Sequence, residues 1–209
     1  MEELTRIAVL VSGGGTNLQA LIDAQGTVIT HGKIELVVSN VSKAYALTRA
    51  EKAGIPSRVI TRKQEGSAGA FEKKLIDTLE EFDIDFIILA GFMSILSEDF
   101  VKRFDHRIIN VHPALIPSFC GKGMYGLLVH EAALAKGVKV TGATVHYVNE
   151  VPDGGEIILQ KAVSIRKNDT SETLQRRVME QAEWKLLPRA AEIVSKKIMA
   201  EKQTKGVNR

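Results

Sequence analysis

Ile108-Ile109-Asn110-Val111-His112-Pro113 is an apolar stretch that ends in an amide, an imidazole and a proline. It predicts a short buried strand on which Asn110 and His112, two residues apart, point to the same side. Pro113 lacks an N–H and has a fixed φ, so the strand would end there and leave His112 at its carboxyl end. An amide donor beside an imidazole is a pair that can serve acyl transfer, because together they can stabilise an oxyanion.

Apolar runs with the length of strands lie on both sides of this stretch and alternate with helical patterns. The predicted strands cover residues 7–11, 33–38, 57–60, 86–90, 140–148 and 156–163. Helices are expected from Thr16 onward, over 44–53, 71–79, 97–104 and 127–136, and from about 170 to 199 with a kink at Pro188; residues 61–69 are expected to form a loop. The alternation predicts an α/β fold, with a doubly wound, mostly parallel Rossmann-like sheet and late antiparallel strands.

The bulk properties are those of a soluble globular protein. We expect one domain over residues 1–199 and a polar tail over 200–209 of the 209-residue chain. The net charge, 28 − 25 = +3, suits anionic small molecules and is too weak to indicate a nucleic-acid partner. The single cysteine, Cys120, excludes an intrachain disulfide. Without a secretory signal or an apolar run long enough to span a bilayer, we expect a cytoplasmic protein with no membrane partner.

A glycine-rich loop, Ser12-Gly13-Gly14-Gly15-Thr16-Asn17, follows the first predicted strand. Thr16 and Gln19 have the spacing of a capping box with Thr16 as the N-cap, and backbone N–H groups at such a helix start favour an anion such as phosphate. No Lys-Ser/Thr pair follows, and the second strand ends in Ser39-Asn40 rather than in a ribose-binding acid. The loop thus favours a phosphate monoester over a dinucleotide, with a tight turn that binds nothing as the alternative.

Several other polar residues leave two interpretations open. Asp153-Gly154-Gly155 is either turn chemistry or a carboxylate that raises the pKa of a nearby histidine. Glu180 and Glu183, one helical turn apart, form either a solvated face or a pair that binds a hydroxylated or cationic ligand. Cys120 has no neighbour in sequence that marks it as an activated nucleophile.

The histidines do not indicate a metal site. His112, His130 and His146 lack the short spacing of a zinc motif, so we expect no metal. His146 alternates with Val145 and Tyr147 on a predicted strand, which can turn its side chain toward the site. His130 is interpreted as structural or as a surface residue.

Together these motifs resemble the phosphoribosylglycinamide formyltransferases, the folate-dependent enzymes of purine synthesis, over about residues 6–198. The segments that carry the resemblance are 12–18, 89–93, 109–117, 145–148, 153–155 and 183–184. The Asn-x-His-Pro segment followed by Asp-Gly-Gly is specific to folate formyltransferases and their hydrolase relatives, and the Gly-Thr-Asn loop narrows the resemblance further. The implied fold is the formyltransferase fold.

The resemblance implies a role for each matching residue. The catalytic residues would be Asn110, His112 and Asp153. The ribotide substrate would bind to Gly15, Thr16, Asn17, Glu180 and Glu183. The co-substrate, 10-formyltetrahydrofolate, would bind to Met93, Ser94, Ile95, Leu96, Asn110, Asn149, Glu150, Val151, Pro152 and Asp153, largely through backbone groups.

The implied reaction is attack of the glycinamide amine on the formyl carbon of the folate. Asn110 and a protonated His112 would stabilise the oxyanion, and Asp153 would hold the imidazolium. The resemblance implies small-molecule substrates and no metal. We expect a monomer or a homodimer.

Three features depart from the family pattern. Ser67-Ala68-Gly69-Ala70 lacks a basic residue that many members carry, and Arg62 or Lys63 could supply its contact. Ser94 stands where an arginine is common, so its contact would have to come from the backbone. The loop over residues 119–126 is longer and richer in glycine than the pattern.

Three alternatives remain open. Formyltetrahydrofolate hydrolase shares the three catalytic residues but carries an N-terminal regulatory domain, whereas this chain begins directly at its first strand. Methionyl-tRNA formyltransferase carries a C-terminal RNA-binding domain, for which we expect no room after residue 198. A non-catalytic module that binds folate or ribotide is the alternative from a different class.

Overall fold

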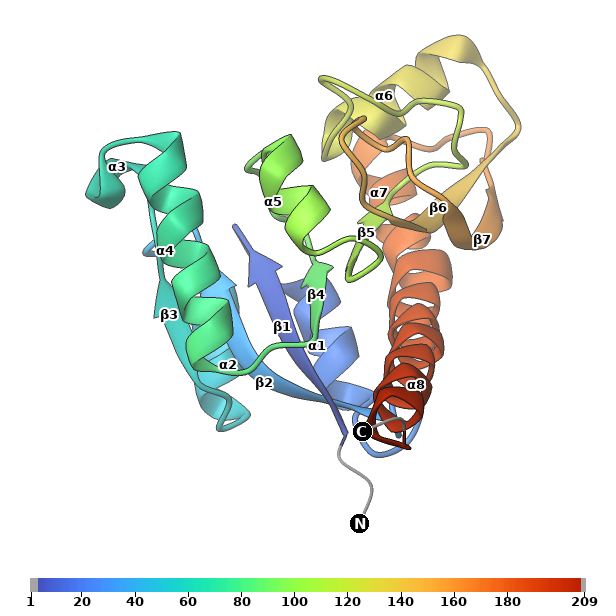
Figure 1. The fold of residues 1–209 in the computed structure, drawn as a ribbon. Helices are drawn as coiled ribbons and strands as arrows, with labels where there is room; N and C mark the ends of the chain where they lie inside the picture. The colour runs from blue at the N-terminus through green and yellow to red at the C-terminus, as the bar shows by residue number, and fades with distance from the viewer. Residues whose placement is uncertain (1–3, 208–209) are drawn as a thin grey trace. The chain divides into compact units, whose positions relative to one another are not determined.

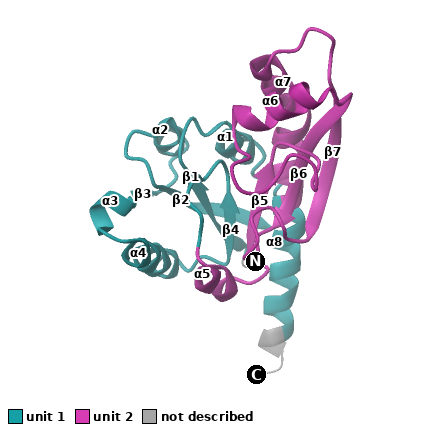
Figure 2. Ribbon diagram, turned by 90° about the horizontal axis from the view of Figure 1, so that it is seen from above, with its two compact units in different colours: residues 1–96, 191–209 teal, residues 97–190 magenta. Residues whose placement is uncertain are grey.

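The structure, a computed structural model, describes residues 4–207 and the side chains of residues 4–204. The chain forms two compact units, which Figure 2 colours separately. Unit 1 contains the residues up to 96 together with those from 191 onward, and unit 2 contains residues 97–190. Figure 1 follows the elements along the chain by colour. None of the helices within the described residues is both long and apolar enough to cross a membrane.

Unit 1 is built on a parallel sheet. Its strands, in the spatial order β3-β2-β1-β4, are β3 (Ser57–Val59), β2 (Gly32–Ser39), β1 (Thr5–Val11) and β4 (Phe86–Leu89). Figure 2 shows α1 (Thr16–Asp23) and α2 (Tyr45–Lys52) over one face of this sheet, and α4 (Ala68–Glu81) over the opposite face. Because helices cover both faces, residues 7–11 of β1 are fully buried, as their continuous apolar run predicted.

The later part of α8 (Trp184–Val207) completes unit 1. Thr5 at the start of β1 donates its hydroxyl to the carbonyl of Ser195 at 2.8 Å. The Glu192 carboxylate accepts hydrogen bonds from the backbone N–H groups of Thr30 and His31, at 2.8 and 3.0 Å. These contacts fasten the helix to the connection that leads into β2.

Unit 2 contains an antiparallel sheet in the order β5-β6-β7. Its strands are β5 (Ile108–His112), β6 (Val140–Tyr147) and β7 (Ile157–Ser164). Its helices are α5 (Glu98–Arg103), α6 (Leu127–Lys136) and α7 (Ser171–Val178), followed by a π-helical segment, η1 (Met179–Glu183), and the first turns of α8. The predicted α/β fold, mostly parallel with late antiparallel strands, is confirmed.

One local prediction was wrong, and the last helical stretch holds an irregularity that the sequence did not predict. The stretch 61–69, expected to be a loop, contains the short helix α3 (Arg62–Glu65), because the Thr61 side chain accepts a hydrogen bond from the Gln64 N–H and caps it. In the last helical stretch a π-helical segment, η1, precedes Pro188, and the kink expected at Pro188 itself stays a prediction. In a regular helix the N–H of residue 188 would bond to the carbonyl of Trp184, but Pro188 has no N–H. The segment η1 ends directly before Trp184, so it adjoins this carbonyl.

The helix α8 continues to Val207, past the residue where the polar tail was expected to begin. The predicted domain bounds, 1–199 and 200–209, stay a prediction.

Candidate active site

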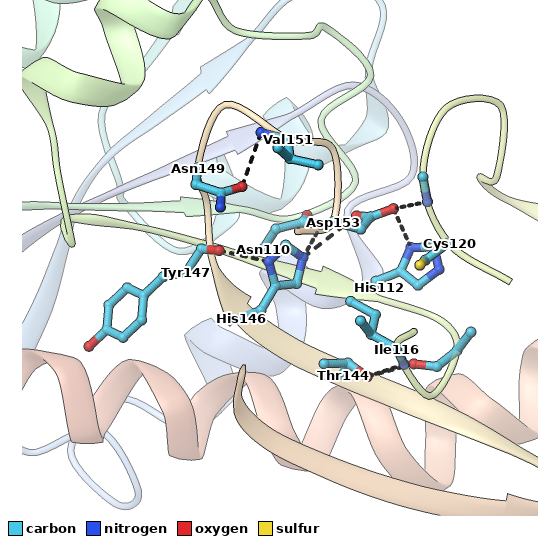
Figure 3. Close-up of polar contacts among 12 residues, drawn as sticks. Asn110, His112, Ile116, Cys120, Thr144, His146, Tyr147, Asn149, Val151 and Asp153 are labelled. Carbon is cyan, nitrogen blue, oxygen red and sulfur yellow. Dashed lines mark hydrogen bonds and ion pairs between the residues drawn. The ribbon is translucent and has the colours of Figure 1, made fainter. Parts of the chain in front are cut away.

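The antiparallel register of β5 and β6 assembles the first part of the site. It pairs Asn110 with His146 and His112 with Thr144. The Asn110 amide nitrogen lies 3.3 Å from Nε2 of His146 (Figure 3). Since Asn110 and His112 are two residues apart on one strand, their side chains share a face, as predicted.

Asp153 brings a carboxylate to this face from the connection between β6 and β7. Its Oδ2 lies 3.5 Å from Nδ1 of His112, and its Oδ1 lies 3.6 Å from Nε2 of His146 (Figure 3). The three side chains are shielded from water, with 4% of His112, 2% of His146 and 13% of Asp153 exposed. The single carboxylate of Asp153 therefore faces two buried imidazoles, one with each of its oxygens.

The turn that carries Asp153 explains the two glycines after it. Asp153 itself has a left-handed φ of 57°. A Cβ on Gly155 would lie 1.8 Å from the carbonyl oxygen of Tyr147, so no other residue fits this close approach. Both interpretations of Asp-Gly-Gly thus hold, since the turn requires the glycines and places the carboxylate beside His112.

His146 is the residue of this cluster to which the sequence assigned no role. Its Nδ1 lies 2.8 Å from the carbonyl oxygen of Tyr147, which can only accept, so Nδ1 carries a proton. In the neutral ring Nε2 is then an acceptor for the Asn110 amide, whereas in the protonated ring Nε2 carries a hydrogen that can face Oδ1 of Asp153, 3.6 Å away. The alternation over residues 145–147 had indicated that its side chain can face the site, and its contacts with Asn110 and Asp153 bear this out.

Burial and polar contacts together lower the pKa values of the two facing groups, His112 and Asp153. Burial lowers the pKa of His112, and it outweighs the opposing effects of the Asp153 charge and of a hydrogen bond to the Phe119 carbonyl. Burial raises the pKa of Asp153, but the contacts with His146 and the Gly121 N–H and the charge of His112 bring that pKa below its usual value. Burial therefore favours the neutral imidazole and the Asp153 carboxylate favours the imidazolium, and the protonated His112 expected from the sequence stays a prediction.

Cys120 does not act as a nucleophile toward this site. Its thiol donates to the carbonyl of Pro117 at 3.3 Å, and burial and the nearby Asp153 charge raise its pKa. A thiol held protonated is a poor nucleophile. This agrees with the absence, in the sequence, of a neighbour that would activate Cys120.

The glycine-rich loop of unit 1 begins α1 differently from the prediction. Gly15, with a φ of 71°, is the N-cap, and no side chain caps the helix, so the predicted capping box at Thr16 was wrong. Arg49 on α2 donates from Nε to the carbonyl of Gly14 at 2.8 Å, and the N–H of Ala46 donates to the carbonyl of Gly13 at 3.1 Å. No side chain caps the N-terminus of α1, and contacts from α2 hold the loop in place. Such a helix N-terminus is suited to bind an anion through its backbone N–H groups.

Gly15 is expected to be irreplaceable for the stability of this loop. Its φ is left-handed, and a Cβ there would lie 2.6 Å from the Cβ of Ala46. Gly15→Ala should lower the free energy of unfolding by roughly 1–3 kcal/mol. Gly14→Ala is the matched control, because a Cβ at Gly14 meets no atom within 4 Å. Chemical denaturation measures both, and equal stability of the two variants would contradict the assignment.

The segment Met93–Leu96 follows β4 in unit 1 and presents apolar side chains to solvent, with Met93 and Ile95 exposed. The N–H of Met93 donates to the hydroxyl of Ser12 at 2.8 Å, and the amide of Asn40 donates to the hydroxyl of Ser94 at 2.8 Å. Ser94, where an arginine is common, thus holds its own segment in place.

Arg62 on α3 also contacts this segment. Its guanidinium donates from Nη2 to the carbonyl of Ile95 at 3.0 Å. A cation therefore lies beside Met93–Leu96 even though Ala68 is not basic, and its use in binding stays a prediction.

The remaining predicted binding residues differ in their surroundings. Asn149 closes a tight turn by accepting the Val151 N–H at 3.1 Å, and Val151 is exposed. Glu183, in η1, is only 6% exposed, whereas Glu180 is partly exposed and pairs with Arg176 at 3.1 Å. The solvated-face interpretation therefore fits Glu180 and not Glu183. Among the described residues no group of three or more His, Cys, Asp or Glu side chains could hold a metal ion, and the expectation of no metal stays a prediction.

Two curated relatives show how far the similarity extends. The phosphoribosylglycinamide formyltransferase of Haemophilus influenzae is 40% identical over 185 residues, which are 88% of this chain and 84% of that protein. The trifunctional purine biosynthetic protein adenosine-3 of Bos taurus is 47% identical over 190 residues, and these cover 91% of this chain but 18% of that protein. The chain thus corresponds to less than a fifth of such trifunctional relatives.

Solved structures agree with the fold described above. Glycinamide ribonucleotide transformylase 1 from Symbiobacterium toebii is 38% identical with a TM-score of 0.86, covering 92% of this chain and 88% of that one. Phosphoribosylglycinamide formyltransferase from Brucella melitensis is 38% identical with a TM-score of 0.85, covering 92% of this chain and 96% of that one. The family model described as formyl transferase matches residues 5–191, which include the glycine-rich loop and the Asn110–His112–Asp153 cluster. This chain belongs to the formyl transferase family.

Proposed function

We propose that this chain transfers the formyl group of 10-formyltetrahydrofolate to the amine of 5′-phosphoribosylglycinamide, giving the N-formyl ribotide and tetrahydrofolate in de novo purine biosynthesis. The observation that carries the proposal is the cluster of Asn110, Asp153 and the buried His112 in a chain of the formyl transferase family. The names of the Haemophilus and Brucella relatives support the choice of acceptor.

Asn110 supplies a donor for the oxyanion. Its amide nitrogen carries two hydrogens, and the contact with Nε2 of His146 uses one of them. The second can donate to the formyl oxygen as negative charge develops there in the tetrahedral intermediate. His146 thus keeps the amide turned so that nitrogen, rather than oxygen, serves the reaction.

His112 moves the proton. As the glycinamide nitrogen forms its bond to the formyl carbon, the neutral imidazole accepts a proton from that nitrogen at Nδ1. The same proton passes to the folate nitrogen when the bond between that nitrogen and the formyl carbon breaks. Between the two proton transfers His112 is an imidazolium. The Asp153 carboxylate, 3.5 Å from Nδ1, stabilises this positive charge.

The substrate contacts follow from the same assignment. The ribotide phosphate binds to the backbone of Gly15, Thr16 and Asn17 at the start of α1, and Glu183 and Glu180 bind the rest of the ribotide. The folate binds to Met93–Leu96 and to residues 149–153, whose exposed apolar side chains suit a flat ring. Both substrates are small molecules. The cytoplasmic location and the monomeric or homodimeric state stay predictions.

A coupled absorbance assay tests the proposal. Purified protein is mixed with 10-formyltetrahydrofolate, with and without the glycinamide ribotide, and without added metal. We expect deformylation of the folate that depends on the ribotide. Deformylation at the same rate without ribotide would replace the proposal by a hydrolase, and no turnover under either condition would favour a module that only binds these ligands.

A further inference from the structure

Two backbone groups of the long loop after β5 contact the catalytic pair directly. Nε2 of His112 lies 2.8 Å from the carbonyl oxygen of Phe119. The N–H of Gly121 donates to Oδ2 of Asp153 at 2.8 Å. Only Cys120 separates the two contacts along the chain, and Figure 3 shows Cys120 beside His112. We call Phe119–Gly121 the clasp segment.

The Phe119 carbonyl decides which nitrogen of His112 can react. A carbonyl oxygen only accepts hydrogen bonds, so the 2.8 Å contact requires a proton on Nε2. In the neutral ring the other nitrogen, Nδ1, is then unprotonated. Nδ1 is also the nitrogen that faces Asp153, at 3.5 Å. The contact therefore leaves the lone pair of His112 on the side of the carboxylate.

The Gly121 N–H acts on the partner of His112. It donates to the same oxygen, Oδ2, that faces Nδ1 of His112. A hydrogen bond from a backbone N–H favours the ionised form of a carboxylate and fixes its direction. Both members of the catalytic pair are thus oriented by one short piece of backbone.

The backbone of the clasp segment is itself unusual. Phe119 has a left-handed φ of 51° and Gly121 has a φ of 89°. A left-handed conformation is unfavourable for a residue as large as Phe119, and such conformations gather at functional sites. The thiol of Cys120, bound to the Pro117 carbonyl at 3.3 Å, closes the turn from within.

We propose that the clasp segment is a positioning element for formyl transfer, in which the Phe119 carbonyl keeps the proton of His112 on Nε2 and the Gly121 N–H keeps Asp153 ionised and aligned. This inference rests on the proposed function and gives a role to the loop over residues 119–126. The residues of the clasp segment need not touch either substrate, because they act through His112 and Asp153.

Gly121→Ala and Gly123→Ala form a matched pair for the test. Both glycines have a φ of 89°, and a Cβ on either meets no atom within 4 Å, so the two substitutions impose the same strain. Only Gly121 has its N–H on Asp153. Gly121→Ala should lower kcat by roughly 10–100-fold with little change in KM, whereas Gly123→Ala should stay close to wild type.

The pH dependence separates positioning from simple damage to the loop. Strain at position 121 in Gly121→Ala displaces the backbone N–H from Oδ2 of Asp153 and so weakens a contact that lowers the pKa of Asp153. The limb of the kcat profile that comes from Asp153, below the one from His112, should therefore move to higher pH in Gly121→Ala only. Equal rates and equal pH profiles in the two variants would overturn the proposal.

A measurement without turnover keeps this inference separate from the proposed function. Nitrogen NMR of the wild-type His112 ring, assigned by comparison with His112→Ala, should show the proton on Nε2. Carboxyl NMR of Asp153, assigned with Asp153→Asn, should show its titration shifted upward in Gly121→Ala and not in Gly123→Ala. A proton on Nδ1 of the neutral ring, or the same Asp153 titration in both variants, would overturn the inference even in an active enzyme. If the NMR results hold but no formyl transfer occurs, the proposed function alone fails.

Discussion

The rate of formyl transfer is expected to fall by about 10²–10⁴-fold when His112 is replaced by Ala, with the fold retained. Nδ1 of His112 lies 3.5 Å from Asp153, whose carboxylate stabilises the imidazolium that forms as the proton moves. Since burial lowers the pKa of His112, the wild-type rate should decline as pH falls below the ordinary histidine value of 6.5, when the base becomes protonated. His112→Ala should not show this decline of the rate at low pH.

Two controls make the His112 result interpretable. His106→Ala removes an exposed histidine that pairs with Asp105 and should leave the rate near wild type. The double variant His112→Ala/Asp153→Asn should lose little more than His112→Ala alone, because residues that act as a unit are not additive. Steady-state kcat and KM, with thermal unfolding as a check of the fold, measure these effects. A rate within a few-fold of wild type in His112→Ala would refute the proposed mechanism.

The second large effect is expected in stability at low pH, from His130 on α6. This histidine is fully buried, and neither ring nitrogen has a hydrogen-bond partner among the described residues. Burial lowers its pKa from 6.5 to about 4, with a smaller contribution from the charge of His112. As pH falls from 6.5, the unfolded chain binds a proton that the folded chain does not, so the free energy of unfolding decreases, by about 3 kcal/mol once the pH reaches the folded pKa.

His130→Leu should remove this acid sensitivity. The variant should be at least as stable as wild type near neutral pH, since two unsatisfied buried nitrogens are lost, and clearly more stable near the folded pKa of about 4. Urea unfolding of both proteins at the two pH values gives the difference, and His106→Leu serves as an exposed control. If the drop in stability between the two pH values is as large in His130→Leu as in wild type, the assignment is incorrect.

The sequence predicts the strands well because buried strands consist of apolar residues, which can be seen directly in the sequence. The apolar runs of β1 and β4 are parallel strands covered on both faces, and the alternation around Asn110 places the amide and the imidazole on one side. The starts of helices are less predictable. Thr16 has the right spacing for a capping box, but Gly15 can adopt the left-handed conformation that this turn requires and therefore takes the N-cap position.

Part of the site is set by contacts that no local pattern reveals. Asp153 follows His112 by 41 positions, as their numbers give, and the antiparallel strands β6 and β7 are needed to bring them within 3.5 Å. His146 enters the cluster only through the pairing of β5 with β6. The lowered pKa of His112 depends on burial that the surrounding elements create together, which no local pattern in the sequence reveals.

Unit 1 is discontinuous along the chain, and this affects the order in which the protein can fold during synthesis. Thr5, Asp85 and the connection that holds Thr30 emerge from the ribosome before residues 97–190, but their partners Ser195, Lys202 and Glu192 emerge after them. Residues 97–190 form a continuous unit and are complete before those partners exist. Domains generally fold as units as they are made. The N-terminal sheet therefore has to wait, with the α8-facing edge of its core open, until the last helix leaves the ribosome.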